Sequence, residues 1–191
     1  MTQTSEPAGV SSDAGAYLRL LHYSHLFASV VRGTLEDRCL RQVTQLRLTI
    51  QQVNLLRLID HSGTHHVGEM ANLLGVSQPA ASKNVDKLVR MKLVVRQVQE
   101  SDRRATALYL TEEGRDLIHR YEKLKEQKLR QALGGLGPRE MDALTEGLET
   151  VSYLILKGES SQGICNRCSA YYTDYCPLRS LAISCSYLKN R

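Results

Sequence analysis

The last 27 residues hold four of the five cysteines of the chain, and their thiolates are the groups in this sequence best suited to chemistry. They follow the spacing C-x2-C-x7-C-P-x8-C at Cys165, Cys168, Cys176 and Cys185. A segment this short buries too little surface to fold alone, and a shared ion or cluster would supply the missing free energy. Four thiolates are the ligand set of structural zinc and of iron–sulfur clusters. The spacing therefore predicts a site at which four cysteines bind one of these two cofactors.

The spacing separates the two cofactors only weakly. The first pair has the spacing of a zinc knuckle, whereas the irregular second pair and the Cys176-Pro177 step are typical of cluster-binding runs, so an iron–sulfur cluster is slightly favoured over zinc. Two disulfides are a third possibility. The N-terminus "MTQTSEPAGVSSDAGA" lacks the basic and apolar regions of a secretion signal, so we expect a cytoplasmic protein whose thiols stay reduced. No apolar run is long enough to cross a membrane, and no membrane partner is expected.

Helices must position this tail and whatever precedes it. Residues 1–15 lack a periodic apolar pattern and are predicted to be a disordered tail. From Tyr17 to Leu35 apolar residues recur at spacings of three, four and seven, which predicts a long amphipathic helix. Thr49 is suited to cap a second helix, in which Val53, Leu56 and Ile59 would face inward. Residues 16–60 are therefore predicted to form N-terminal helices with a dimerisation and support role.

The stretch "HHVGEMANLLGVSQPAASKNVDKLVRMKLVVRQVQ" is the most informative of the chain. A short helix over 67–74 would end at Gly75, and Ser77 would cap a second helix with Pro79 in its first turn. Two helices joined by a few residues that include Gly form a helix-turn-helix, and the small Ala71 and Ala81 allow the helices to cross closely. After Lys92, two β-rich runs flank a polar tip, which predicts a hairpin wing. Residues 61–112 are thus predicted to be a winged helix-turn-helix DNA-binding domain.

Two helices are predicted to close the fold over residues 113–157. Thr111 would cap the first, in which Leu117, Tyr121 and Leu124 continue an apolar stripe, and Pro138 would begin the second. The second carries a near-heptad apolar stripe that needs a partner. Residues 158–163 would be a linker and 164–191 the cysteine-rich tail. The predicted fold class is mainly α with a small β-hairpin wing: a winged helix-turn-helix domain plus N- and C-terminal dimerisation helices.

This order of elements resembles the MarR family of bacterial transcriptional regulators. The stretch "LTIQQVNLL" is similar to the family's second-helix entry, "GVSQPAASKNVDKLV" to its recognition helix, and "SDRRATALYLTEEG" to its wing and exit. The resemblance covers roughly residues 16–157 and implies a symmetric homodimer that binds a pseudo-palindromic operator in double-stranded DNA. Lys92 departs from the pattern, since the family usually has Gly there, and the cysteine tail lies outside the family's usual length. Some relatives bind phenolic or other small effectors, so such an effector is a possible partner.

The residues themselves suggest how DNA would be bound. The recognition helix would expose polar groups that can bond base edges or phosphates, and the net charge of +5 suits an anionic partner. A basic surface alone is common, but together with the helix-turn-helix and the wing it indicates DNA binding. The resemblance assigns minor-groove insertion to Arg104, with Asp102 orienting it, while Arg103 would contact phosphate. The full set of predicted DNA-binding residues is Ser77, Gln78, Pro79, Ser82, Lys83, Lys87, Arg90, Arg96, Asp102, Arg103 and Arg104.

Other chemistry is less well supported. The histidines of "HSGTHHVGE" could form a metal site, but a polar loop before a helix is the favoured interpretation. Cys39 could be a redox sensor with a lowered pKa, but a buried structural residue is favoured. No catalytic motif is visible, so an enzyme is not expected. The sequence therefore predicts a homodimeric transcriptional regulator whose activity is controlled by the tail site. Of the two signs of regulation, repression is the favoured prediction. The alternatives are a thiol redox or electron-transfer protein that uses the CxxC pair, and a winged-helix docking module that does not bind DNA.

Overall fold

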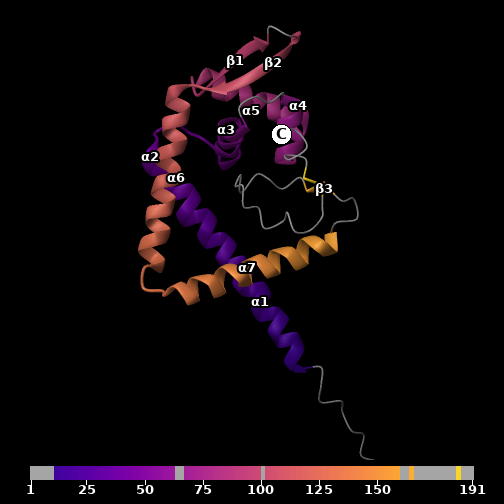
Figure 1. The fold of residues 1–191 in the computed structure, drawn as a ribbon, viewed down its shortest axis with the longest axis vertical. Coiled ribbons are helices and arrows are strands. Elements are labelled where there is room, and N and C mark those ends of the chain that lie inside the picture. Colours follow the sequence, from indigo (N-terminus) through magenta and orange to yellow (C-terminus); the bar gives the residue numbers. More distant parts are fainter. Residues whose placement is uncertain (1–10, 63–66, 100–101, 160–163, 166–183, 186–191) are drawn as a thin grey trace, which may run out of the picture.

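A computed structural model describes residues 11–62, 67–99, 102–159, 164–165 and 184–185. It confirms the predicted fold class, because the described chain is mainly helical with one antiparallel hairpin. Three helices and the hairpin form a compact domain, from which a long N-terminal helix points away on the side opposite the hairpin (Figure 1). Within the described residues, no helix is both long enough and apolar enough to span a lipid bilayer.

One continuous helical rod forms the N-terminus. It consists of α1 (Ser11–Val30), a π-helical turn η1 (Val31–Asp37) and α2 (Arg38–Val43). The helix begins at Ser11, so the prediction of a disordered tail through residue 15 is wrong for its last five positions. The cause is local, because Ser and Asp at the start of "SSDAGA" favour the first turn of a helix. The rod becomes buried only at its end, where Cys39 and Leu40 enter the core.

The compact domain contains α3 (Ile50–Ser62), α4 (Val67–Leu74), α5 (Gln78–Arg90), β1 (Val94–Gln99) and β2 (Asp102–Leu110). Reciprocal bonds cap α3 as predicted: the Gln52 amide donates to Thr49 Oγ1, and the Thr49 amide donates to Gln52 Oε1. Side chains from α2 through α6 build one apolar core. Its fully buried members include Val53, Leu56, Ile59, Met70, Val85, Leu88, Leu108, Leu117 and Tyr121.

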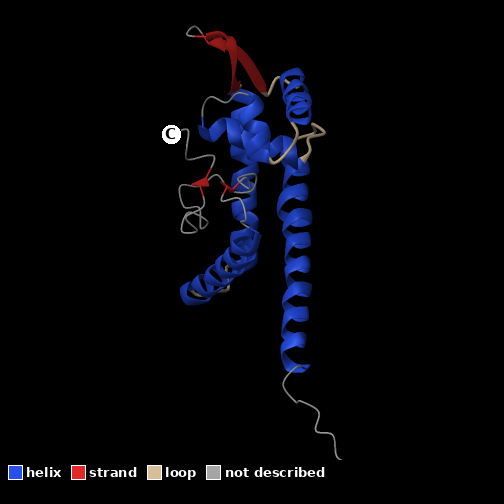
Figure 2. Cartoon of the chain, turned by 90° about the vertical axis from the view of Figure 1, so that its right-hand side faces the viewer, coloured by secondary structure: helices blue, strands red, loops and turns tan. Residues whose placement is uncertain are grey.

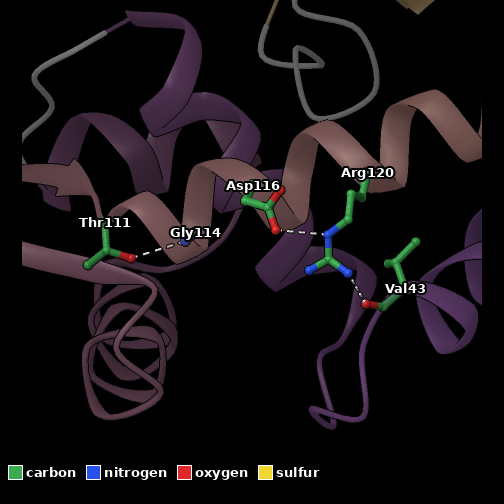
Figure 3. A network of polar contacts seen from close by, with 5 residues as sticks. All are labelled: Val43, Thr111, Gly114, Asp116 and Arg120. Carbon is green, nitrogen blue, oxygen red and sulfur yellow. Dashed lines mark hydrogen bonds and ion pairs between the residues drawn. The ribbon is translucent and has the colours of Figure 1, made fainter.

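Helix α6 (Glu112–Leu133) is joined to this core at two points along its length (Figure 3). At its start Thr111 Oγ1 accepts from the Gly114 amide, which is the predicted cap, and donates to the Lys92 carbonyl in the turn before β1. About two turns further on, Arg120 donates to Asp116 of its own helix and to the carbonyl of Val43 at the end of α2. The first half of α6 is therefore part of the core, while its second half leads away from it.

Helix α7 (Pro138–Glu159) begins at the predicted proline and lies almost entirely in solvent. It runs two residues further than predicted, into the segment expected to be linker. Its apolar stripe and the apolar residues of α1 are exposed. The two helices cross in Figure 1, but Figure 2 shows that they lie well apart. The exposed large apolar residues of these helices are Tyr17, Leu18, Leu20, Leu21, Tyr23, Leu26, Phe27, Val30, Met141, Leu144, Leu148, Leu154 and Ile155.

Candidate DNA-binding surface

Helices α4 and α5 cross on small residues, as the sequence predicts. Ala71 and Ala81 are buried, and Gly75 between the helices has a φ of 63°, the left-handed conformation that glycine adopts without strain. The Val76 amide donates to the Ala71 carbonyl and closes the end of α4. This crossing buries one side of α5, including Val85 and Leu88, and turns the opposite side outward.

The outward side of α5 carries the polar residues predicted to contact DNA. Gln78, Pro79, Lys83 and Arg90 are exposed, whereas Ser82 and Lys87 are half-buried. Ser77 is exposed at the N-cap position, but its side chain makes no capping hydrogen bond there. The sequence predicted a capping bond from Ser77, and this prediction is wrong: the hydroxyl is not committed to the helix end. The structure brings these residues together on α5 and its N-cap residue.

A buried polar contact that the sequence did not predict holds α5 against α3. Gln52 is only 2% exposed, and its Nε2 donates to Asn84 Oδ1 over 3.4 Å. A buried amide costs free energy unless it is hydrogen-bonded, and the capping bond to Thr49 together with Asn84 satisfies Gln52. The sequence gives little indication of this hydrogen bond, because residues 52 and 84 come together only when α3 and α5 pack.

The turn between α5 and the wing uses a strained residue. The Leu93 amide donates to the Leu88 carbonyl and the Lys92 amide to the Val89 carbonyl, the pair of bonds of a Schellman motif. Lys92 has a φ of 60°, in the position where this motif usually has glycine. The departure from the family pattern noted in the sequence is therefore a non-glycine residue in a left-handed turn.

The hairpin wing has an irregular tip. Val98 pairs with Thr106, whereas the next residue, Gln99, pairs with Asp102, so β2 has extra residues at this point. These are Arg103, Arg104 and Ala105. Such bulges occur beside functional sites, where they redirect side chains. The side chains of Asp102, Arg103 and Arg104 lie outside the described part of the structure, so their predicted contacts stay predictions.

Arg96, which was predicted to reach phosphate, lies on β1 with its guanidinium bonded to a residue of α5. Its Nη2 donates to Asp86 Oδ1 over 2.7 Å, and both side chains are partly exposed. Arg96 thus lies beside the recognition helix rather than at the wing tip. Asp86 is exposed on α5, and the sequence did not predict this partner for it.

The cysteines fall into two groups. Cys39 is fully buried and its Sγ lies 3.7 Å from the Thr34 carbonyl oxygen, to which it donates. Burial raises the pKa of the Cys39 thiol, an effect that the charges of Lys128 and Lys125 partly offset. A thiol with a raised pKa is a poor nucleophile, so Cys39 is a buried structural residue, as the sequence favoured.

The tail is described only at two short strands. β3 (Ile164–Cys165) and β4 (Ser184–Cys185) pair in parallel, with Cys165 and Cys185 as register partners. Cys168 and Cys176 lie outside the described residues, as do His65 and His66 of the other suggested metal site. Among the residues that are described, no group of three or more His, Cys, Asp or Glu could hold a metal ion.

Comparison with known proteins agrees with this architecture. Residues 48–105 match the model of the MarR family. A curated relative, the "Uncharacterized HTH-type transcriptional regulator YfiV" of Bacillus subtilis (strain 168), is 30% identical over 108 residues, which are 56% of this chain and 68% of the relative. The family match covers α3, the helix-turn-helix and β1, and it ends within β2.

Solved structures give the same fold. The MarR family transcription regulator SP03579 superposes with a TM-score of 0.68 at 12% identity, covering 79% of this chain and 97% of its own. S. aureus MepR bound to ethidium bromide has a TM-score of 0.53 at 21% identity, with 69% of this chain and 96% of that chain covered. A MepR mutant bound to an oligodeoxyribonucleotide has a TM-score of 0.51 at 22% identity, with coverages of 69% and 97%.

Proposed function

Since the chain belongs to the MarR family of DNA-binding transcription regulators, we propose that it is a homodimeric repressor of a pseudo-palindromic operator. The observation that carries this proposal is the outward side of α5, where Gln78, Pro79 and Lys83 are exposed by a crossing built on buried alanines. Side chains of these types bond base edges in the major groove. The MepR mutant bound to an oligodeoxyribonucleotide, which shares the fold, supports DNA as the partner.

The homodimer is supported by α1 and α7. Both helices expose large apolar side chains, with Leu144 and Leu148 of α7 each about half exposed. Soluble proteins rarely leave contiguous apolar surface of this kind uncovered, and a second copy of the chain would cover it. A two-fold dimer would also place two copies of α5 toward two half-sites, so a symmetric operator is expected.

Membership of a family of regulators favours this function over the two alternatives. Family members are transcription regulators and not enzymes, so a thiol redox enzyme is disfavoured. A docking module without DNA binding would not need a polar outward side on α5. A small-molecule effector stays a prediction for this chain, supported by the ethidium bromide in the MepR structure.

The wild-type protein is expected to enrich one two-fold symmetric sequence from a library of random duplex DNA. Two chains should bind each duplex, with half-site centres about one helical turn apart, because each recognition helix enters a major groove on the same face of the DNA. Sequencing of the enriched pool and analytical ultracentrifugation of the complex would measure both. An unenriched pool, or one chain bound to an asymmetric site, would contradict the proposal. Deletion of the gene should raise transcription from promoters that carry the enriched site, and a fall would make the protein an activator.

For the tail, we propose a four-cysteine site that binds an iron–sulfur cluster, with zinc as the alternative. Its support is the cysteine spacing together with the register of β3 and β4, which pairs Cys165, the first cysteine of the tail, with Cys185, the last. Only residues 160–163 separate the end of α7 from the strand that contains Cys165. A change in the bound group would therefore act close to the proposed dimerisation helix, and the spacing of the two recognition helices would change with it.

Anaerobic purification is expected to yield a brown protein with iron and acid-labile sulfide. Cys165→Ser and Cys185→Ser should each abolish the colour, because each removes a thiolate ligand. Cys39→Ala is the matched control, since Cys39 is buried in the core far along the chain from the tail, and it should keep the colour. Metal analysis and visible absorption measure the outcome. A colourless protein with one zinc ion per chain would replace the cluster by zinc, and a protein without metal would refute the site.

A further inference from the structure

An ion pair joins the recognition helix to the wing. Arg96 Nη2 on β1 donates to Asp86 Oδ1 on α5 over 2.7 Å. The chain between them contains the end of α5, the left-handed turn at Lys92 and the buried start of β1. The ion pair therefore connects α5 directly to β1 across the turn that sets the angle between the recognition helix and the wing.

Stability alone does not explain this contact. The Arg96 and Asp86 side chains are 39% and 49% exposed, and ion pairs that are so accessible contribute about 0–1 kcal/mol. Of the other exposed pairs, Glu126 with Arg130 lies within a single helix, and Asp60 with Arg115 joins α3 to α6, away from the turn between α5 and β1. The pair formed by Asp86 differs because it joins two elements that are proposed to enter different grooves of the same DNA.

A carboxylate at the position of Asp86 is unfavourable for DNA binding unless it binds another group of the protein. It lies one helical turn after Ser82 and Lys83, so it faces the same way as they do. A carboxylate on that side repels phosphates, and the Arg96 guanidinium neutralises it. A guanidinium has five N–H donors, so Arg96 can keep its bond to Asp86 and also bond a phosphate.

We propose that Asp86 is a positioning residue for DNA recognition. Its carboxylate holds Arg96 and so fixes the wing relative to the recognition helix, which lets both reach their grooves of one operator together. This inference rests on the proposed DNA-binding function and adds to it a determinant of specificity. Asp86 itself contacts no base.

The substitution Asp86→Asn gives opposite expectations for positioning and for charge. It removes a negative charge from the DNA-facing side, so electrostatics alone would tighten binding to every duplex. If Asp86 positions Arg96, affinity for the enriched duplex should instead fall by roughly tenfold, while affinity for a scrambled duplex stays the same or rises. Fluorescence anisotropy at one fixed salt concentration measures both affinities, and their ratio is the specificity.

Two further variants separate positioning from folding and from net charge. Asp86→Glu keeps a carboxylate and should restore most of the specificity ratio. Glu126→Gln makes the same change in charge within an ion pair of α6 and should leave the ratio unchanged. All three variants should unfold within a few degrees of the wild type, because exposed ion pairs contribute little stability.

The outcomes distinguish this inference from the proposed function. If the wild type enriches an operator and Asp86→Asn keeps or raises the specificity ratio, the positioning role is refuted and the regulator stands. The same holds if Asp86→Glu loses as much specificity as Asp86→Asn. If the wild type enriches no sequence, the proposed function fails and the positioning role fails with it.

Discussion

Replacing Gly114 by alanine is expected to lower the free energy of unfolding by about 3 kcal/mol. A Cβ at this position would lie 2.2 Å from the carbonyl oxygen of Leu93, and it would also crowd the Leu93 carbonyl carbon and Cα. These are backbone atoms, so no flexible side chain can move aside. The distance would have to grow to at least 3.4 Å for ordinary contact, which requires α6 to move away from the turn before β1.

That movement would break a set of hydrogen bonds at the same junction. The Thr111 amide donates to the Leu93 carbonyl, and Thr111 Oγ1 donates to the Lys92 carbonyl over 2.7 Å while it accepts from the Gly114 amide. The cap of α6 and the turn after α5 are therefore one unit. Urea denaturation followed by circular dichroism would measure the loss as a lower transition midpoint at an unchanged slope.

Two other variants serve as controls. Gly135→Ala meets nothing within 4 Å and has no positive φ, so it should be neutral or slightly stabilising. Lys92→Gly should raise stability by about 1 kcal/mol, because glycine adopts the φ of 60° without the strain of a Cβ. Equal stability of Gly114→Ala and the wild type would contradict this prediction. It would show that α6 can move away from Leu93 at little cost in free energy.

Arg104→Ala is expected to weaken binding to the enriched operator by roughly 10- to 100-fold and to leave folding intact. Resemblance to the MarR family assigns this residue to the minor groove, where a narrow groove attracts an arginine. The extra residues of β2 include Arg103 and Arg104, and bulges of this kind often lie beside functional sites. Competition binding with the enriched duplex at physiological salt measures the loss.

Variants of two other arginines serve as comparisons for Arg104→Ala. Arg103→Ala should weaken binding to specific and non-specific duplexes alike and reduce the salt dependence, as expected for a phosphate contact. Arg130→Ala should change neither affinity, because Arg130 is paired with Glu126 on α6, away from the wing. If Arg104→Ala binds no worse than Arg130→Ala, the minor-groove role of Arg104 is wrong.

The elements that the sequence predicted correctly have local signals. Gly75 ends α4, Pro79 lies in the first turn of α5, Thr111 caps α6 and Pro138 begins α7, and each of these residues acts through its own backbone or its immediate neighbours. The polar outward side of α5 follows from the same signals, since the small residues that face α4 determine which side is left exposed.

The features that the sequence did not predict depend on residues far apart in the chain or on backbone detail. Gly114 looks like an ordinary residue of a first helical turn until Leu93 is placed against it. Asp86 finds Arg96 only after the left-handed turn brings β1 back along α5. The π-helical turn from Val31 to Asp37 has no residue pattern that distinguishes it from an α-helix. The tail was predicted from spacing alone, which indicates its ligands but not the pairing of Cys165 with Cys185.

If the exposed apolar side chains of α1 and α7 form the proposed dimer interface, the abundance of the protein becomes part of its regulation. Helices that are stabilised only by a partner chain lose that stability on dilution, so the helix content of this protein should fall as its concentration falls. Below the dissociation constant of the proposed dimer, the amount of dimer follows the square of the number of chains. Halving the copy number would then reduce the concentration of dimer about fourfold, and a repressor of its own gene would gain a steep feedback without any effector.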